Sequence, residues 1–280
     1  IYINVSIFII GTLINVFLQL FQHSIPDIFG IFALPASFIR FFHQPWSIIT
    51  YMFMHAGLLH ILFNMLWLYW FGSLFLHFFS AKHLRGLYIL GGILGGLLYM
   101  VAYNVFPLFN QEVAVSTLVG ASASVLAIVA ATAYREPNYR VQLFLFGAIR
   151  LKYLALVVIG IDVLSITSSN AGGHIAHLDG ALAGLWFAAS LSKGTDLTSW
   201  INWILDGFIS LFQKKTWERK PKMKVHYGNS ATGREKDYDY NAQKKAQSDE
   251  VDRILEKLKK SGYDSLTTEE KKSLFDASKR

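Results

Sequence analysis

The sequence predicts an all-α fold: a polytopic bundle of six transmembrane helices followed by a cytoplasmic helical tail. Its 280 residues are 53% hydrophobic and only 16% charged, which is too apolar for an ordinary soluble domain. No Asp, Glu, Lys or Arg lies between Arg40 and Lys82, or from Gly86 to Gln111. A bilayer-spanning helix needs about 20 mostly apolar residues, and these stretches supply that length. Residues 193–280 hold 19 of the 26 Lys+Arg and 14 of the 19 Asp+Glu, so this tail is expected to be soluble.

The apolar stretches are long enough for six spans. Basic residues concentrate between the second and third spans and between the fourth and fifth. Cytoplasmic loops carry the Lys/Arg excess, so both termini are predicted to be cytoplasmic. The opening stretch is interpreted as a span because it lacks the basic flank and cleavage site of a signal peptide. The spans are expected at residues 2–21, 57–79, 84–105, 118–134, 151–167 and 173–191.

Three domains follow from this pattern. Residues 1–192 are expected to form the six-helix membrane domain, 193–248 an amphipathic and basic linker, and 249–280 a small cytoplasmic helical hairpin with Gly262 ending its first helix. The formal charge of +7 is explained by lipid head groups and topology. The lipid bilayer is therefore an expected partner and nucleic acid is not.

A serine flanked by small residues opens the fourth span. The segment reads Gly120-Ala121-Ser122-Ala123-Ser124, and small neighbours leave the hydroxyl of Ser122 accessible. Gly, Ala and Ser are also the usual packing residues of membrane helices, so this segment alone does not decide between packing and catalysis. Ser124 is a fallback nucleophile, but it points to a different face of the helix.

A histidine opens the sixth span on the same predicted side of the membrane. Gly180 and Gly184 form a small-xxx-small face that permits close helix contact, and His177 lies nearly one turn before that face. If the neighbour is the fourth span, the imidazole of His177 can take the proton of Ser122. A histidine that only stabilises the bundle through an interhelical hydrogen bond is the alternative.

The second span carries two further polar residues, His60 and Asn64. Positions i and i+4 share one helix face, and both side chains can donate to the oxyanion of a tetrahedral intermediate. An interhelical polar contact is the alternative for either residue alone.

Together these motifs, in this order and at this spacing, resemble the rhomboid family of intramembrane serine proteases over about residues 45–192. The resemblance implies a rhomboid helical bundle and a serine endopeptidase that cleaves transmembrane segments of single-pass membrane proteins, with no cofactor. It implies a catalytic dyad of Ser122 and His177, with the Ser122 amide assisting at the oxyanion. The remaining implied roles are oxyanion stabilisation by His60 and Asn64, and structural motif positions at Gly120, Gly180 and Gly184.

The sequence departs from the family pattern at three positions. Ala123 stands where Gly is usual, Leu126 where many members have an aromatic residue, and Asp179 where Gly is common. Asp179 is two residues from His177, so it should point to another helix face and is not expected to act as a triad acid. No metal site is expected, because the chain has no His-Glu-x-x-His motif and only Asp179 lies at ligand spacing from His174 and His177.

Two other functions compete with a protease. Asp162 in the fifth span would suit a transporter's proton relay, but the sequence shows no internal repeats, so Asp162 is expected near the outer end of its helix, hydrogen-bonded to neighbours. A non-catalytic rhomboid relative that binds membrane helices would typically have lost the serine or the histidine.

The compact six-span build suggests a bacterial inner membrane.

Overall fold

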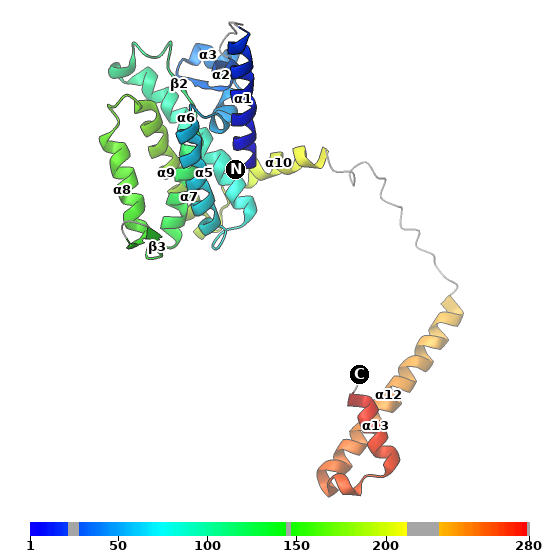
Figure 1. The fold of residues 1–280 in the computed structure, drawn as a ribbon. Helices are drawn as coiled ribbons and strands as arrows, with labels where there is room; N and C mark the ends of the chain where they lie inside the picture. Colours follow the sequence, from blue (N-terminus) through cyan, green and yellow to red (C-terminus); the bar gives the residue numbers. More distant parts are fainter. Residues whose placement is uncertain (22–27, 144–146, 212–229, 279–280) are drawn as a thin grey trace. The chain divides into compact units, whose positions relative to one another are not determined.

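Helices dominate the computed structural model, which describes residues 1–21, 28–143, 147–211 and 230–278 (Figure 1). The chain divides into two compact units, Ile1–Trp217 and Glu218–Arg280. The first unit contains a long helix at each of the six apolar segments expected from the sequence. These helices are α1 (Tyr2–Leu20), α5 (Leu58–Phe75), α6 (Ala81–Val105), α7 (Ser122–Arg135), α8 (Leu151–Leu164) and α9 (Ala171–Ser192).

Three of these helices, α1, α5 and α6, are long and apolar enough to cross a membrane by length and composition among the described residues. Helices α7 and α8 have 14 residues each, which corresponds to about 21 Å of helix against a hydrocarbon core of about 30 Å. Six helices therefore occupy the predicted positions, whereas the predicted count of six spans is not established by their lengths.

Short elements connect the long helices and add two strand pairs to the predicted all-α fold. Strand β1 pairs antiparallel with β2, and β3 pairs antiparallel with β4. Strands of two and four residues give too short a pattern to be recognised in the sequence. The short elements of this unit are α2 (Ile28–Phe32), β1 (Leu34–Pro35), α3 (Phe38–His43), α4 (Ser47–Thr50), η1 (Tyr51–Phe53), η2 (Pro107–Phe109), β2 (Thr117–Leu118), β3 (Arg140–Leu143) and β4 (Gly147–Arg150).

Helix α7 forms the centre of the bundle, and every residue from Ala123 to Ala133 is buried. Helix α9 lies against it backbone to backbone. A methyl group at Gly180 would lie 2.2 Å from the carbonyl oxygen of Ala123, and one at Gly184 would lie 2.1 Å from that of Ala127. These distances leave no room for any side chain, so the two glycines set how closely α9 approaches α7.

Helix α6 approaches the same pair of helices through a glycine stripe of its own. A methyl group at Gly91 would lie 2.5 Å from the Cβ of Ala127, and one at Gly95 would lie 2.8 Å from the carbonyl oxygen of Ala176. Close contact through small residues is the usual way in which membrane helices associate. Figure 1 shows α8 at one edge of the bundle and α1 at the other.

Helix α1 is the most peripheral of the long helices, with Asn4 as its only buried residue. The Asn4 amide donates to the hydroxyl of Tyr88 over 3.3 Å, and that hydroxyl donates to the carbonyl oxygen of Met52 over 2.9 Å. Apolar side chains cover the outer surfaces, for example Leu20, 75% exposed, and Leu58, 71% exposed. Such surfaces are unfavourable in water and are suited to contact with lipid.

Helix α10 (Ser199–Leu211) follows the bundle and lies within the segment expected as an amphipathic and basic linker. Lys82 and Arg85 of α6 both form ion pairs with Asp206 of α10. Arg85 also donates to the amide oxygen of Asn202 over 2.7 Å. The outward-facing Trp203 is 79% exposed, a placement typical of an aromatic anchor at a membrane interface.

The second unit contains α12 (Ser230–Ser261), η3 (Tyr263–Ser265) and α13 (Thr268–Ser278). Gly262 has a φ of +74° directly after α12, as the expected helix end requires. Helix α12 begins well before residue 249, inside the segment expected as a linker. Residues 230–248 lack an apolar repeat but contain good helix formers such as Ala, Lys, Glu and Gln, so the hydrophobic pattern did not reveal this part of the helix.

Candidate active site

Ser122 is the first residue of α7, at the end of the bundle where the chain turns into the helix. The helix was expected to begin at Leu118, but Gly120 adopts a φ of +128° that no helix contains, and residues 117–118 form β2. The amide of Gly120 donates to the carbonyl oxygen of Tyr51 over 3.0 Å, which ties this turn to the neighbouring η1. Ser122 is half-buried, so its hydroxyl is held at the helix start without being sealed off.

His177 faces this hydroxyl from α9. The distance from its Nε2 to the Oγ of Ser122 is 2.6 Å, a short hydrogen bond. Gly180, nearly one turn after His177, approaches the backbone of Ala123, the residue after Ser122, and this close contact brings the two side chains together. The structure thus places the predicted serine and histidine in direct contact although 55 residues separate them.

His60 of α5 lies beside Gly120, in the turn before Ser122. Its Nδ1 accepts a hydrogen bond from the amide of Ala56 over 3.3 Å, so in a neutral imidazole the proton is on Nε2. A methyl group at Gly120 would lie 2.8 Å from that Nε2 and 3.7 Å from the Oγ of Ser122. The Nε2–H of His60 is therefore a hydrogen-bond donor close to the serine, and glycine is required at position 120 both for its φ and for this space.

Asn64 follows one turn later on α5 and is 7% exposed. Its side-chain nitrogen donates to the carbonyl oxygen of His60 over 2.9 Å, which leaves the second N–H of the amide free to serve another acceptor. Asn64, Ser122 and His177 line one cavity of about 240 Å³. Three of the predicted site residues therefore share a space, and His60 adjoins it through Gly120.

Asp162 is a residue whose contact with His177 was not predicted from the sequence. It lies in α8 with its side chain only 5% exposed, and its Oδ1 is 2.9 Å from Nδ1 of His177 and 2.7 Å from Nδ1 of His174. It was expected near the outer end of its helix with neighbouring partners, but not beside the proposed base. The one available sign was a carboxylate within an apolar span, which is costly and usually functional.

Other candidate residues lie away from the serine. The hydroxyl of Ser124 is buried and has no hydrogen-bond partner in the described part of the chain. It faces α6, where a methyl group at Gly92 would lie 2.9 Å from it. The carboxylate beside His174 and His177 is Asp162 and not Asp179, which was the only one at ligand spacing in the sequence.

Asp162, His174 and His177 together form a group whose ligand atoms lie within 4.8 Å of one another, a separation that a metal ion would also require. The observed N···O distances of 2.7 and 2.9 Å are those of ordinary hydrogen bonds from a ring N–H to a carboxylate.

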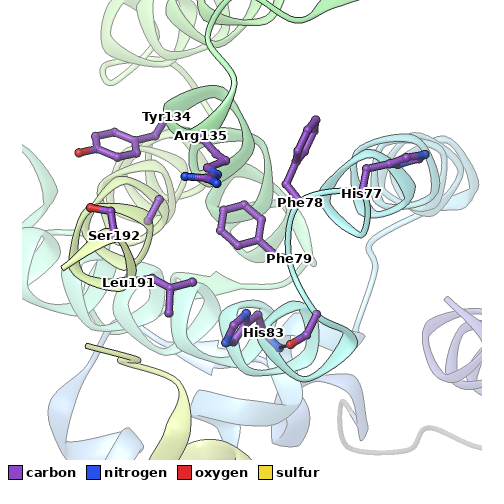
Figure 2. A pocket seen from close by; sticks show the side chains of 10 residues that line it. His77, Phe78, Phe79, His83, Tyr134, Arg135, Leu191 and Ser192 are labelled. Carbon is purple, nitrogen blue, oxygen red and sulfur yellow. Dashed lines mark hydrogen bonds between the residues drawn. The ribbon is translucent and has the colours of Figure 1, made fainter. Parts of the chain in front are cut away.

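A second cavity, of about 500 Å³, opens at the opposite end of α7 (Figure 2). Figure 2 shows Arg135, the last residue of α7, and Phe79 projecting into this space. Arg135 is thirteen residues from Ser122, or about 20 Å along the helix. The larger cavity therefore does not contain the paired serine and histidine, and the smaller one does.

Comparison with known proteins bears directly on this site. The family model of the Rhomboid domain matches residues 43–194, more than half of the chain and almost the range of the resemblance noted in the sequence. The chain belongs to the rhomboid family. This rhomboid is an integral membrane protein of a family of intramembrane proteases, in agreement with its apolar helices.

A curated relative is RHOMBOID-like protein 12, mitochondrial, from Arabidopsis thaliana. It is 29% identical over 157 residues, which cover 53% of this chain and 47% of the relative. The rhomboid chain therefore spans about half the length of that relative. Residues 234–280 match a family of unknown function, DUF6576, which covers α13 and most of α12.

Proposed function

We propose that this rhomboid is an intramembrane serine endopeptidase that cleaves transmembrane segments of single-pass membrane proteins. The contact between Ser122 Oγ and His177 Nε2 carries the proposal, because a nucleophile needs a base within hydrogen-bond reach. The close contact between α7 and α9 at Gly180 and Gly184 holds this pair together. A polar contact formed by chance would not need such close helix packing. The apolar side chains of Phe63 and Trp67 line the same cavity, and they suit a substrate that arrives from the membrane.

The proposed reaction is acyl transfer. The Oγ of Ser122 attacks the carbonyl carbon of the scissile bond while Nε2 of His177 takes the hydroxyl proton. When the C–N bond breaks, His177 returns that proton to the leaving amine. A water molecule activated by the same histidine then hydrolyses the acyl-enzyme. This chemistry requires no cofactor.

Three donors are available for the oxyanion. The amide of Ser122 is among the first N–H groups of α7. These groups have no partner inside the helix and form the positive end of its dipole. The Nε2–H of His60 and the free N–H of Asn64 supply the other two. Donors that are fixed before the reaction stabilise the developing charge without reorganisation.

The membrane arrangement belongs to the same proposal. Six spans with both termini on the cytoplasmic side agree with the position of Ser122 and His177 at one end of the bundle and of the basic Lys82 and Arg135 at the other. The expected bacterial inner membrane has no support from the Arabidopsis relative, whose name is mitochondrial. The proposal is therefore confined to an intramembrane protease domain with substrates in the same bilayer.

A non-catalytic rhomboid that only binds membrane helices is the competing function. Both it and the protease predict binding of a helical substrate, so cleavage has to be measured. We expect Ser122→Ala and His177→Ala each to abolish cleavage of a single-pass substrate by the purified protein in liposomes, and a fluorophosphonate probe to label the wild type but not Ser122→Ala. Ser124→Ala is the matched control and is expected to retain both activities. Cleavage that persists in Ser122→Ala would contradict the assignment.

A further inference from the structure

Asp162 is an aspartate in the last turn of α8 whose observed partners are two histidine rings. Its Oδ1 is bonded to the Nδ1 atoms of His177 and His174, while its Oδ2 is buried and has no partner among the described residues. A carboxylate with a purely structural role would be expected to cap a helix or pair with a cation, and neither arrangement is present in the described part of the chain. Its hydrogen bonds to the two rings suggest instead that Asp162 acts on the protonation of the histidines.

The hydrogen bonds determine where the imidazole protons lie. An ionised carboxylate only accepts hydrogen bonds, so each Nδ1 that contacts Oδ1 must carry a proton. In a neutral imidazole a protonated Nδ1 leaves a lone pair on Nε2. For His177 this Nε2 is the atom 2.6 Å from the hydroxyl of Ser122. The contact with Asp162 therefore selects the tautomer in which His177 can accept the serine proton.

We propose that Asp162 is a positioning residue that converts the Ser122–His177 pair into a Ser–His–Asp triad, with its acid supplied by α8. This inference rests on the proposed protease function. Asp162 holds the His177 ring in orientation and in the Nδ1–H tautomer. It also faces the imidazolium that forms when Nε2 takes the serine proton, and stays ionised itself throughout the cycle. The proton passes from Ser122 to His177 and on to the leaving amine.

His174 has a supporting part in this arrangement. Its Nδ1 donates to the same Oδ1 over 2.7 Å, so two rings from one turn of α9 fix the direction of a single carboxylate oxygen. Asp162 and His177 are both on the wall of the 240 Å³ cavity, and the low exposure of the carboxylate keeps competing water away from the bond. In such surroundings a charged hydrogen bond is stronger than at a surface.

The first test measures the tautomer directly in the wild-type protein. Solid-state NMR of the full-length protein in liposomes, labelled with ¹⁵N-histidine, is expected to show His177 protonated at Nδ1 and unprotonated at Nε2. The His177 signals are assigned by their absence from His177→Ala. A His177 that carries its proton on Nε2 in the folded enzyme would overturn the proposal without any change at Asp162.

The second test uses the isosteric variant Asp162→Asn, with Asp179→Asn as its matched control. We expect kcat for a single-pass substrate to fall by about 10²-fold to 10⁴-fold in Asp162→Asn, in line with loss of the acid from other triads, and to stay within about twofold of wild type in Asp179→Asn. The ¹⁵N spectrum of Asp162→Asn should lose the Nδ1–H signature of His177, which a merely structural role would leave unchanged. Asp162→Glu keeps a carboxylate and should recover part of the rate.

The outcomes separate this inference from the proposed function. If Ser122→Ala and His177→Ala abolish cleavage while folded Asp162→Asn keeps the wild-type kcat, the triad is wrong and the protease is retained. If Ser122→Ala still cleaves, the protease assignment itself fails. If chelation with EDTA abolishes wild-type cleavage and added Zn²⁺ restores it, Asp162, His174 and His177 form a metal site and the triad is overturned.

Discussion

At the scale of single residues, the site depends on the two histidine rings near Ser122. In each ring Nδ1 is already hydrogen-bonded, which leaves Nε2 available. The Ala56 amide occupies Nδ1 of His60, so that ring donates through Nε2. Asp162 occupies Nδ1 of His177, so that ring accepts through Nε2. The two histidines therefore have opposite tautomers, and in the proposed reaction His60 is an oxyanion donor and His177 is the base.

The role of His60 can be tested by its removal. We expect His60→Ala to lower kcat by about 10²-fold with little change in KM, because a donor to the oxyanion acts mainly in the transition state. The measurement is steady-state cleavage of a single-pass substrate in liposomes. His43→Ala removes an exposed ring that is hydrogen-bonded to the carbonyl oxygen of Ile39 in its own helix, and it should cleave like the wild type. An increase in KM with unchanged kcat would show that His60 contributes to substrate binding instead.

At the scale of secondary-structure elements, the contact between α7 and α9 decides whether the site exists. Gly180 and Gly184 allow the backbone of α9 to lie against that of α7. The serine on one helix and the histidine on the other are correctly spaced only at that separation. A protein with the same serine and histidine but a bulkier helix face would hold them apart.

Gly184→Ala tests this dependence. Its new methyl group would lie 2.1 Å from the carbonyl oxygen of Ala127, so the helices must separate. We expect a loss of about 1–3 kcal/mol of stability, the usual cost of overpacking, together with a large loss of cleavage. Thermal unfolding in detergent and the cleavage assay measure the two effects.

Gly160→Ala in α8 is the matched control, because a methyl group there meets nothing within 4 Å. A helix-interior alanine is favoured over glycine by about 0.5–1 kcal/mol, so this variant should be as stable as the wild type or slightly more so, and fully active. Equal stability of Gly184→Ala and the wild type would argue against the close α7–α9 contact.

At the scale of the whole molecule, the charged tail is a separate helical unit with its own stabilising contacts. Among the described residues of this unit, Ile254 of α12 and Leu266 are the buried apolar ones. Glu270 accepts hydrogen bonds from Lys257 over 2.8 Å and from the amide of Thr267 over 2.9 Å, and Thr267 Oγ1 in turn accepts from the Glu270 amide over 3.2 Å. The Thr267–Glu270 pair is a capping box at the start of α13.

The tail hairpin should be sensitive to acid. The hydrogen bond from Lys257, and after it the one from the Thr267 amide, hold the pKa of Glu270 below its ordinary value. A depressed folded-state pKa stabilises the fold above the unfolded pKa, about 4.3 for Glu, and this contribution is lost as pH falls through the folded pKa.

Hydrogen exchange of the amides of α12 and α13 in the full-length protein measures this effect. Protection in the wild type should fall toward that of Glu270→Gln as the pH is lowered through this range, and exceed it at pH 7. Glu269→Gln, which removes a neighbouring carboxylate outside these contacts, should behave like the wild type. Equal protection of wild type and Glu270→Gln at pH 7 would contradict the prediction.

The sequence by itself determined the apolar helices and the identity of the serine, histidine and glycine positions, because those signals are local: a run of apolar residues or a spacing of three or four along one helix. It did not give the start of α7 at Ser122, since the φ of Gly120 and the pairing of Thr117 and Leu118 with β1 depend on distant segments. Nor did it show that α7 and α8 would have only 14 residues each.

The tertiary structure alone decided the partner of His177. Asp179 is two residues away on the same helix and points elsewhere, whereas Asp162 is 15 residues away and meets the ring at 2.9 Å. The orientation of α8 about its own axis and its packing against α9 bring that carboxylate to Nδ1. The spacing of residues along the sequence predicts neither the orientation nor the packing. The sequence thus predicted the serine and the histidine, and the packing of a third helix placed Asp162 against that histidine.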